Sequence, residues 1–177
     1  KKSLLFIPTL LLCCSNFVFL AINKGPVDSK PNYLNLINGA VSCAATALCE
    51  ELIFRVMASD VAKTKFNKIL TLVITAGIFG ATHFIARVFG DPFGATIQAG
   101  YSLFLGLVVG FTYLYGGSLI AAVLIHFLFN FINDSLFSVI YAGDWNVAFY
   151  IINLSVGMLV AIYLFVLLVF SIKKNQK

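Results

Sequence analysis

The sequence predicts an all-α protein: a polytopic bundle of about six transmembrane helices that form one integral membrane domain over residues 1–177. Hydrophobic residues make up 60% of the chain, charged residues make up 11%, and the mean hydropathy is +0.98. A soluble domain is closer to half apolar and one quarter charged. Apolar stretches near the roughly 20 residues that a helix needs to cross a bilayer recur along the whole length. The lipid bilayer is therefore an expected partner, and a sizeable soluble domain is excluded.

Turn residues divide the chain into six predicted spans, which cover residues 4–22, 34–59, 69–86, 95–115, 118–141 and 147–172. The first stretch follows two lysines and lacks a clear small-x-small cleavage motif, so we expect a retained span rather than a signal peptide. Residues 90–94, Gly-Asp-Pro-Phe-Gly, mark one turn, and Gly116-Gly117 mark the next. Gly106 and Gly110 either allow a neighbouring helix to approach closely or reflect the ordinary glycine content of membrane helices.

Basic residues gather at the ends of the predicted spans, mostly on one face of the membrane. Because lysine and arginine are enriched on the cytoplasmic side, their distribution predicts that both termini and the loop at residues 60–68 are cytoplasmic. The net charge of +5 therefore needs no nucleic-acid partner. The richer face holds eight basic residues and the other face three: Lys1, Lys2, Lys63, Lys65, Lys68, Lys173, Lys174 and Lys177 against Lys24, Lys30 and Arg87.

Two adjacent carboxylates and a guanidinium lie inside the second predicted span, in the apolar stretch 44–58. Each ionised side chain costs a few kcal/mol or more at the centre of a bilayer, so such groups are paired, face a cavity or do chemistry. Glu51 and Arg55 are four residues apart and can pair on one helix face. A structural ion pair explains them as well as a catalytic role does. Glu50 points about 100° away from Glu51 and has no local partner.

Both histidines of the chain, His83 and His126, also lie inside predicted spans. At a rise of about 1.5 Å per residue, Glu50, His83 and His126 can all meet near the middle of the bilayer. Asn130 is four residues after His126 and shares its helix face. Any one of these side chains alone is explained by an interhelical hydrogen bond, but their convergence in three spans predicts a shared polar site.

The polar face of the fifth predicted span continues through Asn133 and Asp134, seven and eight residues after His126. This stripe lies in a helix built otherwise of leucine, isoleucine, phenylalanine and valine. It must face protein or water rather than lipid. Asn133 and Asp134 are therefore expected to line a wet cavity.

Three motifs stand in one order along the chain: Glu50-Glu51-x-x-x-Arg55, Phe79-x-x-x-His83 and His126-x-x-x-Asn130. In this order and spacing they resemble the CPBP family, formerly the Abi family. That family groups type II CaaX prenyl endopeptidases with bacteriocin-processing and related intramembrane proteases. The resemblance covers about residues 34–141, which corresponds to the four-helix catalytic core of the family.

The resemblance implies an intramembrane endopeptidase that hydrolyses a peptide bond in a membrane-associated peptide or protein. It implies that Glu50 and His83 activate a water, that His126 and Asn130 stabilise the oxyanion, and that Glu51 with Arg55 braces the site. An amide and an imidazole aimed at a developing oxyanion are common electrostatic stabilisers.

Whether a metal takes part is left open by the residues and by the family, which is described both as metalloproteases and as glutamate proteases. Two histidines and a carboxylate could form a three-ligand zinc site, but there is no His-Glu-x-x-His motif. If zinc bound both histidines and Glu50, only Glu51 would remain as a base, and Arg55 is expected to occupy it. Zinc is therefore possible and not favoured.

The four cysteines lie in apolar stretches without a Cys-x-x-Cys motif, which predicts buried thiols rather than disulfides or a zinc cluster.

Substrate and biological role also have alternatives. A CaaX-type tail and a bacteriocin or signal-peptide precursor are both compatible with the sequence. The short chain favours a protein of the prokaryotic plasma membrane with a role in peptide processing or immunity. One rival is a non-catalytic immunity or scaffold protein that binds a peptide partner. A second is a small proton-coupled transporter, which the lack of an internal repeat disfavours. The oligomeric state is open.

Overall fold

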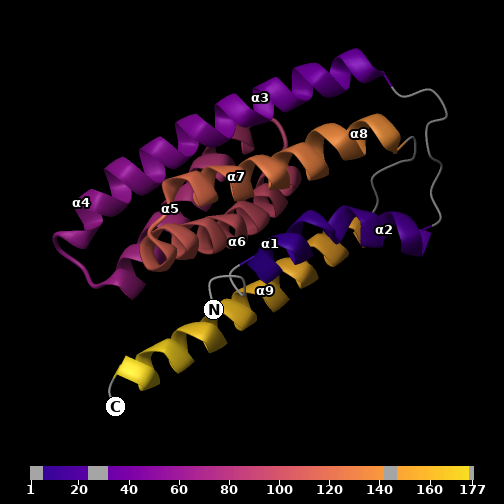
Figure 1. The fold of residues 1–177 in the computed structure, drawn as a ribbon. Coiled ribbons are helices and arrows are strands. Elements are labelled where there is room, and N and C mark those ends of the chain that lie inside the picture. Colours follow the sequence, from indigo (N-terminus) through magenta and orange to yellow (C-terminus); the bar gives the residue numbers. More distant parts are fainter. Residues whose placement is uncertain (1–5, 24–31, 142–146, 176–177) are drawn as a thin grey trace.

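The computed structural model describes residues 6–23, 32–141 and 147–175, and these residues form helices joined by turns, with no strand among them (Figure 1). Five of the six predicted spans are continuous helices that are long and apolar enough to cross a membrane, which confirms the predicted fold class. They are Tyr33–Lys63, Lys68–Arg87, Pro92–Gly116, Leu119–Ile140 and Val147–Leu167. The helices are α1 Phe6–Cys13, α2 Ser15–Asn23, α3 Tyr33–Glu51, η2 Leu52–Ser59, α4 Asp60–Lys63, α5 Lys68–Arg87, α6 Pro92–Gly116, α7 Leu119–Asn130, η3 Phe131–Leu136, α8 Phe137–Ile140 and α9 Val147–Asn175.

Side-chain caps fix where the long helices begin. The Asn32 side chain accepts backbone hydrogen bonds at the start of α3, and Asn67 does the same at the start of α5. Asp91 caps α6, whose first residue is Pro92. Gly117 ends α6 with φ of 69°, in the left-handed region that favours glycine. The turn residues found in the sequence therefore lie at helix boundaries, as predicted.

The first predicted span, 4–22, forms two shorter helices, α1 and α2, which are interrupted at Cys14. The carbonyl oxygen of Leu12 lies near this break. It accepts hydrogen bonds from the Ser15 hydroxyl at 2.9 Å and from the Asn133 amide at 3.4 Å. The Ser15 hydroxyl and the Asn133 amide thus replace the backbone N–H donor that a continuous helix would offer to this carbonyl. Through Asn133 the first segment is also connected to the bundle.

An asparagine chain holds the N-terminal helices to the C-terminal helix and to η3. The Asn153 amide donates to the Asn16 side-chain oxygen at 2.9 Å, and the Asn16 amide donates to the backbone carbonyl of Asn133 at 3.1 Å. Asn16 and Asn133 are buried. Since such interhelical hydrogen bonds stabilise membrane bundles, α2 and α9 are attached to the helix that carries His126 and Asn130.

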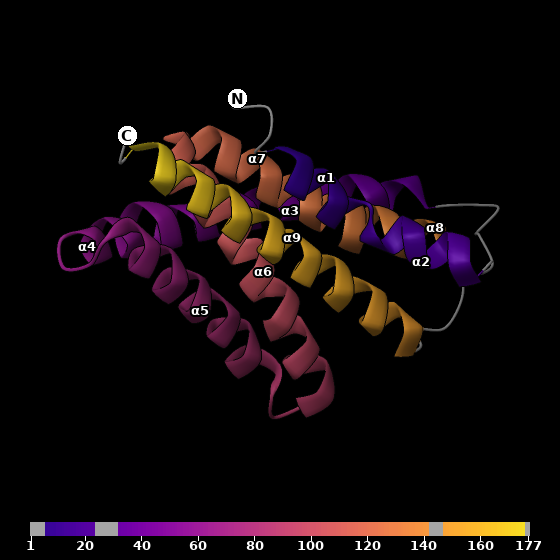
Figure 2. The ribbon, with the colours of Figure 1, turned by 90° about the horizontal axis from the view of Figure 1, so that it is seen from below.

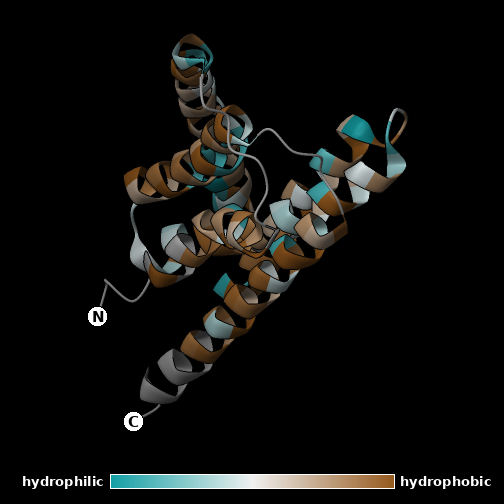
Figure 3. Cartoon of the chain, turned by 90° about the vertical axis from the view of Figure 1, so that its right-hand side faces the viewer, coloured by the Kyte–Doolittle hydropathy of each residue, from teal (hydrophilic) through white to brown (hydrophobic). Residues whose placement is uncertain are grey.

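Contacts between the long helices position the site. α5 packs along α6, and α3 packs along α7 and η3. α9 lies across α6, with α1 and α2 beside it (Figures 1 and 2). Small residues allow the first of these contacts: a Cβ atom added at Gly106 would lie 3.1 Å from the Ala76 Cα atom. The glycine pattern of the fourth predicted span thus faces a neighbouring helix. Hydrophobic residues cover most of the helix lengths (Figure 3), as expected for surfaces that contact lipid.

Two π-helical segments interrupt the helices that carry the site, and the sequence patterns did not predict them. In η2 the Ser59 hydroxyl donates to the carbonyl oxygen of Phe54, five residues earlier, at 2.7 Å. The second segment, η3, contains Asn133 and Asp134. Such segments occur often at functional sites because they displace side chains from the regular helical positions.

Membrane orientation remains a prediction. α9 ends at the same end of the bundle as α4 (Figures 1 and 2). This agrees with the prediction that the lysines of residues 60–68 and those at the end of α9 lie on the same side of the membrane. Lys1, Lys2, Lys24, Lys30 and Lys177, which enter the charge distribution, lie outside the described residues. The cysteines are free thiols, but Cys14 and Cys49 are exposed on the bundle surface rather than buried as expected.

Candidate active site

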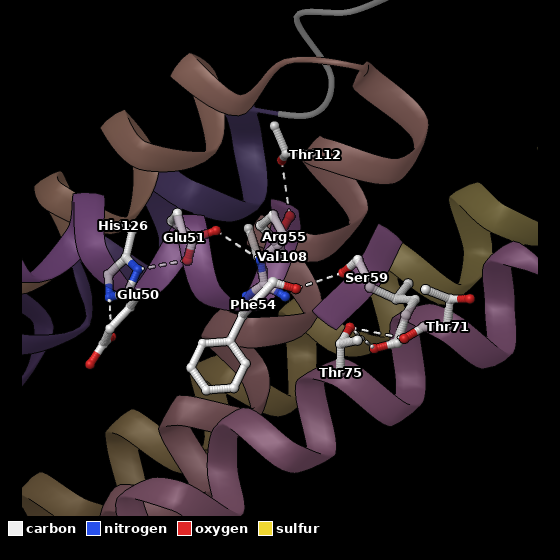
Figure 4. Close-up of polar contacts among 11 residues, drawn as sticks. Glu50, Glu51, Phe54, Arg55, Ser59, Thr71, Thr75, Val108, Thr112 and His126 are labelled. Atoms are coloured by element: carbon white, nitrogen blue, oxygen red, sulfur yellow. Dashed lines mark hydrogen bonds and ion pairs between the residues drawn. The ribbon is translucent and has the colours of Figure 1, made fainter. Parts of the chain in front are cut away.

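Three charged or titratable side chains, Glu51, Arg55 and His126, form what we call the buried cluster (Figure 4). Arg55 Nε donates to Glu51 Oε2 at 2.7 Å, and His126 Nδ1 lies 2.8 Å from Glu51 Oε1. Both oxygens of the Glu51 carboxylate are therefore occupied. An ionised carboxylate only accepts hydrogen bonds, so the proton between His126 and Glu51 is on Nδ1 of His126. The other ring nitrogen, Nε2, faces Glu50.

Phe79 connects the buried cluster to the second histidine. Its ring centroid lies 4.6 Å from that of His83 and 5.7 Å from that of His126, in edge-on arrangements. The Arg55 guanidinium carbon lies 5.8 Å from the centre of the same ring. Phe54 packs edge-on against it as well, at 4.9 Å. The aromatic residue of the Phe-x-x-x-His motif thus separates and orients the two imidazoles.

Glu50 faces both histidines from the other side. Its Oε2 lies 3.4 Å from His126 Nε2, and its Oε1 lies 3.9 Å from His83 Nε2. His83 Nδ1 lies 2.9 Å from the carbonyl oxygen of Phe79, which can only accept, so the proton of a neutral His83 is on Nδ1. The Nε2 atoms of both histidines are then the ones near Glu50. Its side chain is 26% exposed, yet Oε2 is buried and has no hydrogen bond within the described residues.

A cavity of about 150 Å³ opens beside Glu50. Of the six side chains predicted for the site, four line this cavity and two lie behind it in the buried cluster. Asn130 is in the lining, and its side chain makes no hydrogen bond within the described residues. The lining residues are Thr46, Glu50, Phe79, His83, Gln98, Tyr101, Ser102, Leu105, His126, Phe129, Asn130 and Asp134. We call Glu50, His83, Asn130 and Asp134 the open cluster.

Ligand types that suit zinc are present at the site, but they are not arranged as a preformed metal centre. No three histidine, cysteine, aspartate or glutamate side chains converge at metal-binding geometry in the described part of the chain. Two imidazole Nε2 atoms near one carboxylate are ligand types of zinc, and Glu51 and the Phe79 carbonyl hold the opposite nitrogens of these rings, as outer partners of metal-bound histidines do.

Some lining residues were not predicted for the site. Tyr101, Gln98 and Ser102 come from α6, whose polar residues are scattered among apolar ones without a motif. Asp134 could have been found, because an intramembrane carboxylate on the His126 helix face is a functional candidate by default. Its position in the cavity matches the expectation that it lines a wet space.

Comparison with known proteins gives one match. A family model described as "Type II CAAX prenyl endopeptidase Rce1-like" matches residues 32–132. This region contains α3, η2, α4, α5, α6 and α7, and with them every side chain of the buried cluster. No curated protein and no solved structure matches the chain.

Proposed function

The chain belongs to the type II CAAX prenyl endopeptidase Rce1-like family, and from that premise we propose that Glu50 is the general base of its peptide hydrolysis. At the level of the family the protein is a CAAX-type intramembrane endopeptidase, an integral membrane protein that acts on a membrane-associated peptide. The finer assignment of roles to residues rests on the geometry of the open and buried clusters.

One observation carries the assignment: the Glu50 carboxylate faces both histidines at the cavity, Oε2 toward His126 and Oε1 toward His83, and its buried Oε2 lacks a hydrogen bond within the described residues. At 3.9 Å, Glu50 Oε1 and His83 Nε2 are too far apart for a direct hydrogen bond. A water can instead lie between them. In that position it would donate one proton toward the carboxylate and be aligned by the imidazole.

Hydrolysis then follows by general acid–base catalysis. Glu50 accepts a proton as the water oxygen forms a bond to the scissile carbonyl carbon, which gives a tetrahedral oxyanion. When the C–N bond breaks, the proton passes to the leaving nitrogen. The products are a carboxylic acid and an amine, which exchange a proton to become a carboxylate and an ammonium group, and Glu50 returns to its ionised form.

His126 and Asn130 are proposed to stabilise the oxyanion. The Asn130 amide has no other partner within the described residues and lines the cavity. The Nδ1 proton of His126 is held by Glu51, so His126 would donate to the oxyanion from Nε2 as an imidazolium. Arg55 in turn holds Glu51 in place. This arrangement gives the buried cluster a supporting role in the reaction.

The Glu50→Gln variant tests the assignment. Glutamine keeps the size of the side chain but removes the base, and a neutral group costs less to bury, so folding should be retained or improved. Cleavage should fall by about 10² or more, the low end of what a positioned base contributes. His83→Ala should fall to a similar level, and the double variant little further, because residues acting as one unit are not additive.

A substrate for this measurement can be found by comparing the membrane peptides of cells that contain wild-type or Glu50→Gln protein. A well-folded Glu50→Gln protein that processes such a peptide at a near wild-type rate would remove Glu50 from catalysis. A non-catalytic immunity or scaffold role would then explain the site better.

We further propose that both termini lie on the cytoplasmic side of a prokaryotic plasma membrane. The support is the excess of basic residues in the segments that the sequence predicts for one side of the membrane. Reporter fusions at the two ends should give the same cytoplasmic signal, and opposite signals would exclude this topology.

A further inference from the structure

His126 lies between two carboxylates, with one at each nitrogen of its ring (Figure 4). Its Nδ1 atom lies 2.8 Å from Glu51 Oε1, and its Nε2 atom lies 3.4 Å from Glu50 Oε2. Glu51 is fully buried and is also paired with Arg55, so it holds the Nδ1 proton in place. Nε2 is therefore the nitrogen that is able to exchange a proton during a reaction. Among the described residues, Glu50 is the titratable side chain that Nε2 contacts.

His83 is held differently. Its Nδ1 atom donates to the backbone carbonyl of Phe79 at 2.9 Å, and its Nε2 atom lies 3.9 Å from Glu50 Oε1. The Phe79 ring packs against both imidazoles, and no hydrogen bond joins the two histidines in the described part of the chain. Glu50 is thus the group that faces both histidines, with one carboxylate oxygen toward each.

Two more titratable side chains, Asp134 and Tyr101, line the same cavity. Neither forms a hydrogen bond or an ion pair with Glu50 or with a histidine among the described residues. The contacts therefore describe one path for a proton. It runs from the water proposed at Glu50 Oε1, through the Glu50 carboxyl group, to Nε2 of His126 on the other side.

We propose that His126 is the general acid of the reaction: it gives its Nε2 proton to the leaving nitrogen and regains a proton from Glu50. This inference rests on the proposed peptide hydrolysis and specifies how the proton taken by Glu50 reaches the leaving group. Asn130 stays with the oxyanion, while His126 first donates a hydrogen bond to that oxygen and then transfers the proton to the neighbouring nitrogen. Histidine is the side chain used most often for such transfers.

The cycle starts with an ionised Glu50 and with protons on both nitrogens of His126. The water oxygen bonds to the carbonyl carbon, its proton goes to Glu50 Oε1, and the π electrons of the C=O bond move onto oxygen to give the oxyanion. When the C=O bond re-forms, the C–N bond electrons go to the nitrogen, which takes the Nε2 proton of His126. A half-turn of the Glu50 carboxyl group, whose terminal torsion is broad, brings the protonated oxygen to the neutral Nε2. Transfer of that proton restores both residues.

A pair of substrates that differ only in the leaving atom tests the transfer. The first is acetyl-Ser-Ser-Cys(farnesyl)-Val-Leu-Ser, a tail of the CAAX type. The second has a thioester in place of the amide that wild type cleaves, which mass spectrometry identifies. An amide nitrogen must gain a proton as it leaves, whereas a thiolate leaves without one because the pKa of a thiol is about 8.5. If wild type cleaves the peptide found by the membrane comparison faster, the thioester is placed in that peptide instead.

His126→Gln keeps a neutral N–H donor close to the position of Nε2 but cannot transfer its proton. In single-turnover reactions in detergent, it should slow amide cleavage about tenfold or more beyond its effect on the thioester. Asn130→Ala is the matched control, because it removes an oxyanion donor and no acid, and it should slow both substrates equally, by about 10². Glu51→Gln is a second variant that retains His126. It removes the carboxylate at Nδ1 and should also slow the amide more than the thioester.

The proposal fails if His126→Gln slows the amide and the thioester by the same factor, or leaves amide cleavage at the wild-type rate. If His126→Gln does not fold, equal slowing of both substrates by Glu51→Gln excludes the transfer. Loss of cleavage in EDTA that zinc restores also excludes it, because a metal bound at Nε2 would leave no proton there. Equal slowing leaves the assignment of Glu50 as the base intact. Cleavage of both substrates by Glu50→Gln at near wild-type rates would instead defeat that assignment.

Discussion

Glu50 and Glu51 are adjacent in the chain and differ in almost every physical respect. Glu51 is fully buried, and both of its oxygens are occupied at 2.7 and 2.8 Å by Arg55 and His126. Glu50 is partly exposed, faces the Nε2 atoms of two histidines and has an oxygen without a hydrogen bond in the described chain. The helix rotation of about 100° between neighbours directs one carboxylate between helices and the other into the cavity.

This difference separates support from reaction. A buried charge with all of its partners is held in one position and has little capacity left for a substrate. A carboxylate with an oxygen that accepts no hydrogen bond can accept a proton or bind a ligand. Charge alone therefore does not identify a catalytic residue inside a membrane, because both clusters contain charged side chains. Substitutions in the two clusters should therefore differ in their effects on stability and on activity.

Arg55→Ala should have the largest effect on stability. It leaves the Glu51 carboxylate without its cation inside the protein, and removing one partner of a buried pair costs about 3–5 kcal/mol. Thermal unfolding in detergent and folded yield would measure the loss. Lys63→Ala is the control, since its pair with Asp60 is at the surface and such pairs contribute little. A variant at Arg55 with wild-type yield, unfolding temperature and activity would contradict the supporting role.

His126→Ala and His83→Ala should both lower cleavage but differ in stability. His126 is buried and provides the donor to Glu51 Oε1, so its removal leaves a buried acceptor unpaired at a cost of about 1–3 kcal/mol. His83 is partly exposed, and its ring bonds only the Phe79 carbonyl of its own helix. We expect its loss to change the unfolding temperature little. Equal destabilisation by the two variants would show that the distinction between the clusters is wrong.

Much of the bundle was predictable because its determinants are local. Apolar stretches of sufficient length and the Gly and Pro turns predicted six spans, five of which are long helices, and the caps at Asn67, Asp91 and Ser118 lie close to the expected boundaries. The spacing of Glu51 and Arg55 predicted their ion pair, which is a contact within one helix. Helical periodicity also predicted that His126 and Asn130 share a face, and both line the cavity.

Contacts between helices could not be derived in the same way. The second partner of Glu51 is His126, 75 residues later, and no local pattern specifies that approach. The π-helical segments depend on side chains such as Ser59 that bond backbone groups in the folded bundle. Near the interruption at Cys14, Asn133 reaches the Leu12 carbonyl from a distant segment. The catalytic roles of the site residues stay proposals, because a catalytic role depends on contacts with a substrate.

Gly110→Ala should have the smallest effect and probes how tightly the buried cluster is packed. A Cβ atom at this position would lie 2.7 Å from Leu72 Cδ1 and 3.3 Å from Arg55 Nη1, so both side chains must move slightly, at a cost of about 1 kcal/mol. Gly77→Ala on α5 is the control, because no heavy atom lies within 4 Å of its added Cβ. In an Arg55→Lys background, which lacks the Nη1 atom, Gly110→Ala should cost measurably less, since contacting residues are not additive. An identical cost in both backgrounds would mean that Gly110 accommodates Leu72 alone, and that the guanidinium does not depend on the space left by the glycine.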